Sequence, residues 1–325
     1  MNKQMSLSAL NDELAQVRTK KKEFLAEIDR IVPWGEWIAL IQPCYYKGER
    51  GNKPYDLERM LRIYLVQNLY NLSDMATVAE VIDSRAFSDF CGVESSNQVP
   101  DGDTLGRFRN LLIRNHLQEK LFAQVVDLLA QRGLILKKGT IVDSTFIESP
   151  SSTKNQKKQR DPEAHSAKKG NTWHFGYKAH IGVDSKSGLV HTVKVTSANV
   201  HDVTVISDLL TGEEEVVYGD SGYLGADKRP EALKKNNAGK LVRYKLNRRP
   251  TASKNRSARS KAQIKRREHE KSSVRAKVEH VFAIIKQRLR FCKTRYRGLR
   301  KQIAKLNMMF ALANLILADR PCLAA

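Results

Sequence analysis

Cysteine and long apolar runs are both scarce in this chain of 325 residues. The four cysteines lie far apart and form no CxxC pair, which argues against a structural zinc ribbon and against a disulfide framework. They are Cys44, Cys91, Cys292 and Cys322. The longest apolar stretch, residues 306–318, is interrupted by two asparagines and is too short to span a bilayer. The N-terminal sequence lacks the apolar segment of a signal peptide, so we expect a cytoplasmic protein without a membrane partner.

Acidic residues are outnumbered, with 35 Asp and Glu against 57 Lys and Arg, and the formal net charge is +22. The excess is concentrated, since residues 240–300 contain 22 basic and 3 acidic side chains and residues 151–180 contain 7 and 2. A solvated surface loop explains either segment alone. Together they predict a polyanionic partner, most often nucleic acid. The apolar content of 41% excludes a wholly disordered chain.

Residues 1–135 are predicted to form an all-helical N-terminal domain for DNA binding or oligomerisation. Apolar residues recur at heptad spacing from Leu7 to Ile31, which fits either a coiled-coil arm or, as we favour, a helix packed on its own domain. Further along, Ser73 and Asp103 are predicted to be helix N-caps.

Two arginines, Arg107 and Arg109, lie near the start of a long predicted helix and are expected to contact DNA. A helix-turn-helix-like module and a helical bundle with a solvated basic face explain this pattern equally well.

Residues 136–325 are predicted to form an α/β catalytic domain. Strands are expected at 140–148, 172–184, 189–199, 213–223 and 240–247, and helices at 201–210, 226–237, 272–291 and 301–318. The segment between the first two strands reads as a polar basic loop, and the last helix is apolar on several sides, as expected of a buried helix. The order of elements indicates an α/β fold with a mixed sheet.

The tract of residues 248–271 is basic, rich in serine and poor in apolar residues, so it is predicted to be mobile without its ligand. The lysines and arginines that begin this tract and end the earlier basic loop are expected to contact DNA; they are Lys168, Lys169, Arg248 and Arg249.

Three carboxylates stand out from their surroundings. Asp143 lies within a β-run, where an unpaired buried acid is costly, and Asp220 ends another strand before a glycine-containing turn. Glu279 lies on a helix at the border of an apolar stripe, and Arg275 and Lys286 fall within roughly 40° of it. Each acid alone has a simple structural explanation, but three in this strand-strand-helix order form a more specific pattern.

Carboxylates that converge in a basic protein need cations, and hard oxygen ligands favour Mg²⁺ or Mn²⁺. Two such ions about 4 Å apart activate an attacking oxygen and stabilise the leaving oxygen at one phosphodiester. Asp143, Asp220 and Glu279 are therefore the predicted metal ligands and catalytic residues, with two Mg²⁺ ions for which Mn²⁺ may substitute.

Residues 141–184, 217–225 and 273–291, which contain these acids, closely resemble the DDE transposases of the insertion-sequence-5 family. Residues 54–74 and 100–112 resemble the N-terminal domain of that family. The likeness runs from about Ile31 to Asp319.

This resemblance implies an RNase H-like catalytic core preceded by an all-helical domain, with Asp143, Asp220 and Glu279 as the DDE triad. It also implies a bacterial enzyme at the nucleoid that moves an element bounded by terminal inverted repeats, acting on double-stranded DNA as a homodimer. The family signature around the third acid is Tyr, Arg, Glu and Lys; Arg275, Glu279 and Lys286 fit, but Ser272 occupies the tyrosine position.

Two further patterns have competing interpretations. His174, Lys178, His180 and Asp184 share one predicted strand face, which is better explained as a polar sheet face near DNA than as a zinc site. Trp173 begins a strand; partial burial is the favoured prediction, and stacking on an extruded base is the alternative. Two other functions remain open at this stage, a non-transposing nuclease on the same fold and a DNA-binding repressor with inert acids.

Overall fold

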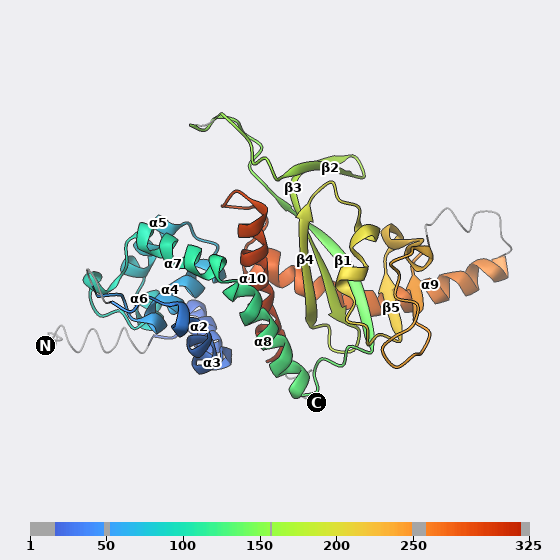
Figure 1. The fold of residues 1–325 in the computed structure, drawn as a ribbon, viewed down its shortest axis with the longest axis horizontal. Coiled ribbons are helices and arrows are strands. Elements are labelled where there is room, and N and C mark those ends of the chain that lie inside the picture. Colours follow the sequence, from blue (N-terminus) through green and yellow to red (C-terminus); the bar gives the residue numbers. More distant parts are fainter. Residues whose placement is uncertain (1–16, 49–52, 157, 249–257, 320–325) are drawn as a thin grey trace, which may run out of the picture.

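The computed structural model describes residues 17–48, 53–156, 158–248 and 258–319. A helical N-terminal part lies beside a mixed sheet, and two long helices complete the molecule (Figure 1). The N-terminal helices are α2 (Lys20–Ile31), α3 (Trp34–Ile41), α4 (Leu57–Leu69), α5 (Asp74–Asp83), α6 (Arg85–Cys91), α7 (Gly102–Arg114) and α8 (Leu117–Gln131), with 3-10 turns η1 (Gln42–Cys44) and η2 (Ser96–Gln98).

Short polar side chains begin several of these helices. The hydroxyl of Ser73 accepts from the backbone N–H of Ala76 and caps α5, as predicted. The predicted cap at Asp103 is wrong by two residues, because it is Asp101 that accepts from the backbone N–H of Thr104 at 2.6 Å. Asp103 lies in the first turn of α7, where its charge still favours the positive end of the helix dipole.

Helix α2 packs on its own protein rather than standing free, since Leu25 and Ile28 are buried and α2 contacts α6 and α10. The preference for a packed helix is confirmed for this stretch. The earlier heptad positions Leu7, Leu10 and Leu14 lie outside the described residues.

The sheet contains β1 (Gly139–Glu148), β2 (His165–Lys169), β3 (Thr172–Asp184), β4 (Val190–Ser197), β5 (Val216–Gly219) and β6 (Arg243–Leu246). The hydrogen-bonded order is β2-β3-β1-β5-β6, and β4 also pairs with β3. Strand β1 is antiparallel to β3 but parallel to β5, and β5 is parallel to β6. The predicted mixed sheet is therefore confirmed, and its parallel half brings the carboxyl ends of β1 and β5 to the same edge.

Two helices after the sheet close the core. Helix α9 (Ala258–Ala283) continues into a π-helical turn, η8 (Ile284–Arg288), and α10 (Leu299–Ala318) follows. Helix α10 is almost entirely buried, as predicted, and it contacts both α8 and β4, so it lies between the N-terminal helices and the sheet (Figure 1). One apolar core extends through all of these elements. No helix within the described ranges has the length and apolar character needed to cross a membrane.

Four local predictions are wrong. The predicted basic loop contains strand β2, which pairs with the start of β3. The predicted helix at 226–237 is only a 3-10 turn, η6 (Ala226–Lys228), followed by irregular chain. The predicted helix at 201–210 consists of the 3-10 turns η3 (Asp202–Val205) and η4 (Ser207–Leu209). From Ala258 onward the tract predicted to be mobile is helical, because α9 begins there rather than at Ser272.

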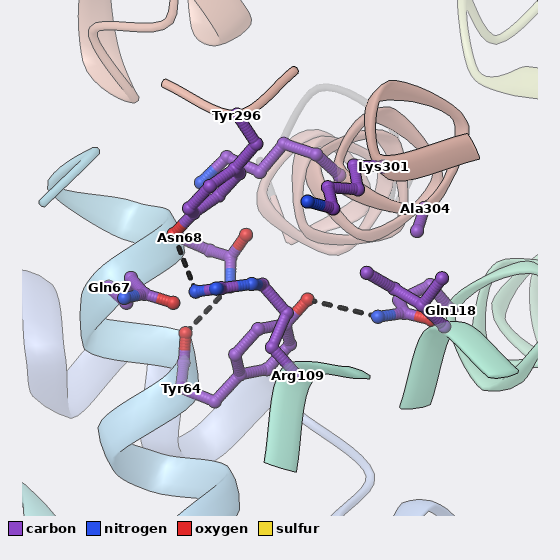
Figure 2. A pocket seen from close by; sticks show the side chains of 10 residues that line it. Tyr64, Gln67, Asn68, Arg109, Gln118, Tyr296, Lys301 and Ala304 are labelled. Atoms are coloured by element: carbon purple, nitrogen blue, oxygen red, sulfur yellow. Dashed lines mark hydrogen bonds between the residues drawn. The ribbon is translucent and has the colours of Figure 1, made fainter. Parts of the chain in front are cut away.

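Arg109 is not at the surface, which corrects its predicted role in DNA contact. Its side chain is only 12% exposed; it pairs with Asp74 and donates to the phenol oxygen of Tyr296 at 2.9 Å. Figure 2 shows the guanidinium beneath the Tyr296 ring, 4.0 Å from its centre. The surrounding cavity of about 10 Å³ is bounded by α4, α7, α8 and α10, so this arginine joins the N-terminal helices to the C-terminal part.

Candidate active site

Strand register brings Asp143 and Asp220 to the same level of the sheet. In the parallel pair of β1 and β5, Ile141 lies opposite Tyr218. Each aspartate follows two residues later, Asp143 within β1 and Asp220 directly after β5, and neighbouring strands are about 4.8 Å apart. The charge of Asp220 accordingly contributes to the raised pKa of Asp143. Two acids far apart in the sequence thus become neighbours at one sheet edge.

Asp143 points toward α9, since it shares a sheet face with its cross-strand partner Ile181, which belongs to the core beneath that helix. Its side chain is 15% exposed, and one carboxylate oxygen accepts from Arg275 at 3.2 Å. Burial raises the pKa of the Asp143 carboxyl, the charge of Arg275 opposes this increase, and the charge of Asp220 adds to it. A nearby cation therefore favours the ionised form of this carboxylate.

Asp220 turns the chain directly after β5. Its carboxylate accepts from the backbone N–H of Gly222 at 2.8 Å and so caps the 3-10 turn η5 (Ser221–Tyr223). A Cβ at Gly222 would lie 2.9 Å from the same carboxylate oxygen, so glycine at this position leaves room for the acid. Among the described residues, no hydrogen bond to its other carboxylate oxygen is seen.

Glu279 lies on α9 one helical turn after Arg275, the residue that reaches Asp143. Its side chain is exposed, whereas the adjacent stripe of the helix is buried, as predicted, at Val278, Val281, Ile285 and Leu289. The third acid therefore faces solvent on α9, at the border of the core and one turn from the arginine that reaches Asp143.

The side chains of Asp143, Asp220 and Glu279 do not converge on one point in this structure. In the part of the chain that the structure describes, no three His, Cys, Asp or Glu side chains are close enough together to hold a metal ion. Arg275 instead provides the cation beside Asp143. The donors nevertheless fit Mg²⁺ or Mn²⁺ in kind, because all three are hard carboxylate oxygens and two of them are neighbours on the sheet.

Sequence reasoning missed Asn247, which follows β6. Its amide nitrogen donates to Ser272 and to Glu268, and its oxygen lies 3.4 Å from a guanidinium nitrogen of Arg275. Ser272, at the signature tyrosine position, is thus part of the contacts that orient Arg275. No pattern in the sequence marks Asn247, because its importance comes only from the end of β6 meeting α9.

The sequence also predicted no role for Tyr223. It is buried against Val142 and Val217 in the smaller core on the opposite sheet face. Burial, and then the charges of Asp202, Asp143 and Asp220, raise the pKa of its hydroxyl well above the usual value. The tyrosine of the sequence DSGY therefore supports the turn that carries Asp220.

The histidines of β3 do not gather around a metal. His174 stacks on Phe146, with ring centres 4.7 Å apart, and His180 is fully buried near Asp202. Asp184 accepts hydrogen bonds from backbone N–H groups of the adjoining turns, including those of Leu136 and Lys186. These side chains are structural, and burial lowers the pKa of His180 to about 4.

The predicted DNA-contacting residues fall into different environments. Exposed positions are Arg107 on α7, Lys168 and Lys169 on β2, and Arg248 after β6, whereas Arg249 lies outside the described residues. Lys286 is half-buried in the π-helical turn η8; burial lowers the pKa of its ammonium group, Lys169 adds to this, and Cys292, Glu148 and Glu279 oppose it. The charges of both Glu279 and Lys169 therefore act on Lys286.

Comparison with known families agrees with this arrangement. Residues 136–315 match the family described as "Transposase DDE domain", and residues 12–111 match the one described as "Transposase domain (DUF772)". The first match covers more than half of the chain and includes all three acids, and the second includes Arg107. No solved structure matches the chain.

Proposed function

The chain belongs to the DDE transposases, which are DNA-cleaving and DNA-joining enzymes with an RNase H-like core, and from this premise we propose that it moves an insertion element of the insertion-sequence-5 family. It would bind the terminal inverted repeats, cleave the DNA at the element ends and join the 3′-OH ends to target DNA. The observation that carries this proposal is the adjacency of Asp143 on β1 to Asp220 at the end of the parallel strand β5, together with α9, which carries Glu279 and reaches Asp143 through Arg275.

Asp143, Asp220 and Glu279 would hold two Mg²⁺ ions, or Mn²⁺ in their place. When bound, these ions supply an activated attacking oxygen and stabilisation of the leaving oxygen. The chain itself contributes fixed geometry, because β1 and β5 are hydrogen-bonded neighbours and Asp220 is locked by its turn. The charge of Arg275 favours the ionised form of Asp143, and its guanidinium would contact a DNA phosphate at the site.

The proposed reaction has two steps at one site. Water first attacks the phosphodiester at the element end, and the 3′ oxygen leaves as a free 3′-OH. That hydroxyl then attacks a phosphodiester of the target, so that one bond forms as another breaks. Exposed cations at Lys168, Lys169 and Arg248 would hold the DNA backbones during both steps.

Joining two element ends to one target calls for a homodimer on DNA. With DNA as its substrate, the protein would act at the bacterial nucleoid.

The direct test uses the purified protein and a labelled duplex that carries the inverted repeat flanking its gene. We expect strand cleavage at the repeat end only when Mg²⁺ or Mn²⁺ is added, and joining of that end to a supercoiled plasmid. A duplex with a scrambled repeat is the control. Cleavage without joining would support a nuclease instead, and binding without cleavage would support a repressor.

A second prediction concerns the ion pair of Arg275 with Asp143. Since the guanidinium occupies one oxygen of a proposed metal ligand, Arg275→Ala should bind Mn²⁺ about tenfold more tightly in the absence of DNA, as measured by electron paramagnetic resonance. Its DNA cleavage should nevertheless fall, because a phosphate contact is lost.

Lys277→Ala is the matched control for this experiment. Lys277 lies on the same helix, but its ammonium group donates to the backbone oxygens of Ser185 and Lys186 rather than to a carboxylate. Its Mn²⁺ affinity should equal that of the unchanged protein. Equal affinity in Arg275→Ala would show that the arginine does not compete with the metal.

A further inference from the structure

Trp173 is exposed, which corrects the prediction that it is partly buried. Its exposed fraction is 68%, whereas Trp37 is fully buried in the N-terminal helices. A large aromatic side chain left in water on a soluble protein is a common mark of a binding surface. It lies on the hairpin of β2 and β3, which rises at the edge of the molecule (Figure 1).

The surroundings of Trp173 are positively charged. Lys168 is its direct cross-strand partner, and Lys169 lies opposite Thr172; both lysines are exposed. Residues 165–173 contain no acidic side chain. An aromatic ring beside one lysine, with a second lysine on the other face of the hairpin, suits a nucleic acid, whose bases offer flat apolar faces and whose backbone offers negative charge. It suits a second copy of the same hairpin poorly, because like charges would meet.

The hairpin is aligned with the candidate active site. Side chains alternate along β3, so Trp173 shares a sheet face with Ile181, and Ile181 lies opposite Asp143. Eight residues separate Trp173 from Ile181, a distance of about 27 Å along an extended strand. Lys286, on the turn that follows α9, responds to the charge of Glu279 and to that of Lys169 on the hairpin.

We propose that the β2–β3 hairpin is a second DNA-contacting element, a two-stranded ribbon that enters the major groove of the element end about eight base pairs from the cleaved bond. Trp173 packs against base edges there, and Lys168 and Lys169 contact the phosphates on either side of the groove. A two-stranded ribbon fits the width of the major groove, and 27 Å corresponds to about eight steps of the duplex. The inference rests on the proposed function, since it assigns a substrate contact to that same site.

The test measures binding by the full-length Asp143→Asn protein, which should not cut its substrate, to labelled duplexes of 6, 12 and 20 base pairs taken from the element end. Trp173→Ala on this background should weaken binding to the two longer duplexes by about tenfold and leave the shortest within twofold. A second series of 20-base-pair duplexes carries one abasic site at a different position in each. For the Asp143→Asn parent, the abasic site should weaken binding most when it lies near position 8, counted from the cleaved bond. For Trp173→Ala on this background, it should have no such effect.

Leu241→Ala is the matched control, because Leu241 is 72% exposed and also has basic neighbours, but lies outside the hairpin. Trp173→Tyr should retain most of the affinity, which separates loss of the ring from loss of the fold. Equal binding by Trp173→Ala at every length would overturn this inference alone. The inference would also be overturned if Trp173→Ala changed the oligomeric mass of the protein without DNA but left its DNA affinity unchanged. The hairpin would then be an interface between protein molecules. Binding by the parent that does not depend on the repeat would overturn the proposed function as well.

Discussion

Replacing Asp143 with asparagine is expected to lower the rate of strand cleavage by at least ~10³-fold, or about 4 kcal/mol of transition-state stabilisation, while binding to the element end persists. The amide has the shape of the acid but no negative charge with which to hold a divalent cation. Single-turnover cleavage of a labelled repeat, together with a gel-shift measurement on the same samples, checks both parts.

Asp220→Asn and Glu279→Gln should behave in the same way, and a double substitution should be little worse than a single one, because the three acids act as a unit. Asp227→Asn is the control; Asp227 is an exposed acid seven residues after Asp220, in the turn η6. Normal cleavage by Asp143→Asn would remove this residue from the catalytic site.

Replacing Lys305 with methionine is expected to stabilise the protein by roughly 4 kcal/mol at pH 7 or below. Lys305 is buried in α10 beside the Arg109 cavity, with its ammonium group 5.6 Å from the centre of the Phe291 ring. Burial, and then the charges of Arg295 and Arg109, lower the pKa of Lys305 to about 7. Each unit of that lowering corresponds to about 1.4 kcal/mol, which methionine would recover.

The same lysine predicts how stability changes with pH. Between about pH 7 and 10.5 the amine is neutral in the folded protein but still protonated in the unfolded chain, so the unfolded state binds more protons. The free energy of unfolding should therefore rise with pH in that window, by up to about 1.4 kcal/mol per unit. Below pH 7 the amine is charged in both states, and its contribution no longer changes.

Urea unfolding at several pH values, followed by circular dichroism, checks both statements. Lys305→Met should lose the alkaline rise, and Lys301→Met should keep it, since Lys301 lies one turn earlier on α10 and is exposed. A methionine variant less stable than the unchanged protein would mean that the buried ammonium group has partners that outweigh its desolvation.

The candidate acids were predictable because each violates a local rule. Asp143 interrupts an apolar strand, Asp220 ends another, and Glu279 borders an apolar stripe on a helix. The sheet was predictable for a related reason, since alternation along residues 172–184 sets which side chains face the core. The adjacency of Asp143 and Asp220 was not predictable, because it depends on the register between β1 and β5.

The wrong predictions involved segments whose structure depends on distant contacts. Strand β2 has an exposed, polar sequence and forms because β3 offers it an edge. The part of α9 before Ser272 has few apolar residues, yet Lys271 and Glu268 in it bind Leu246 at the end of β6 and Asn247 directly after it. Helical propensity favoured a helix at 226–237, but Pro230 lies within it and the chain turns away there.

The predicted exposure of the side chain was wrong for one arginine, Arg109, and for one tryptophan, Trp173. Arg109 looked like a DNA contact because it follows Arg107 by two residues, but on a helix that spacing puts the two side chains on different faces. Trp173 was predicted to be partly buried because it begins a strand, but it is 68% exposed, whereas Tyr177, four residues later on β3, is fully buried. Sequence pattern gives the face of an element and not the extent of the layer that covers it.

The position of α10 has a consequence for how the protein is made. Because synthesis runs from the N-terminus, α10 leaves the ribosome after every other element that the structure describes, yet it supplies core contacts to α8 and α4 near the beginning. The N-terminal helices therefore have part of their apolar surface exposed until the last helix arrives. Completion of this fold, and with it the joining of the helical part to the sheet, waits until α10 has been synthesised.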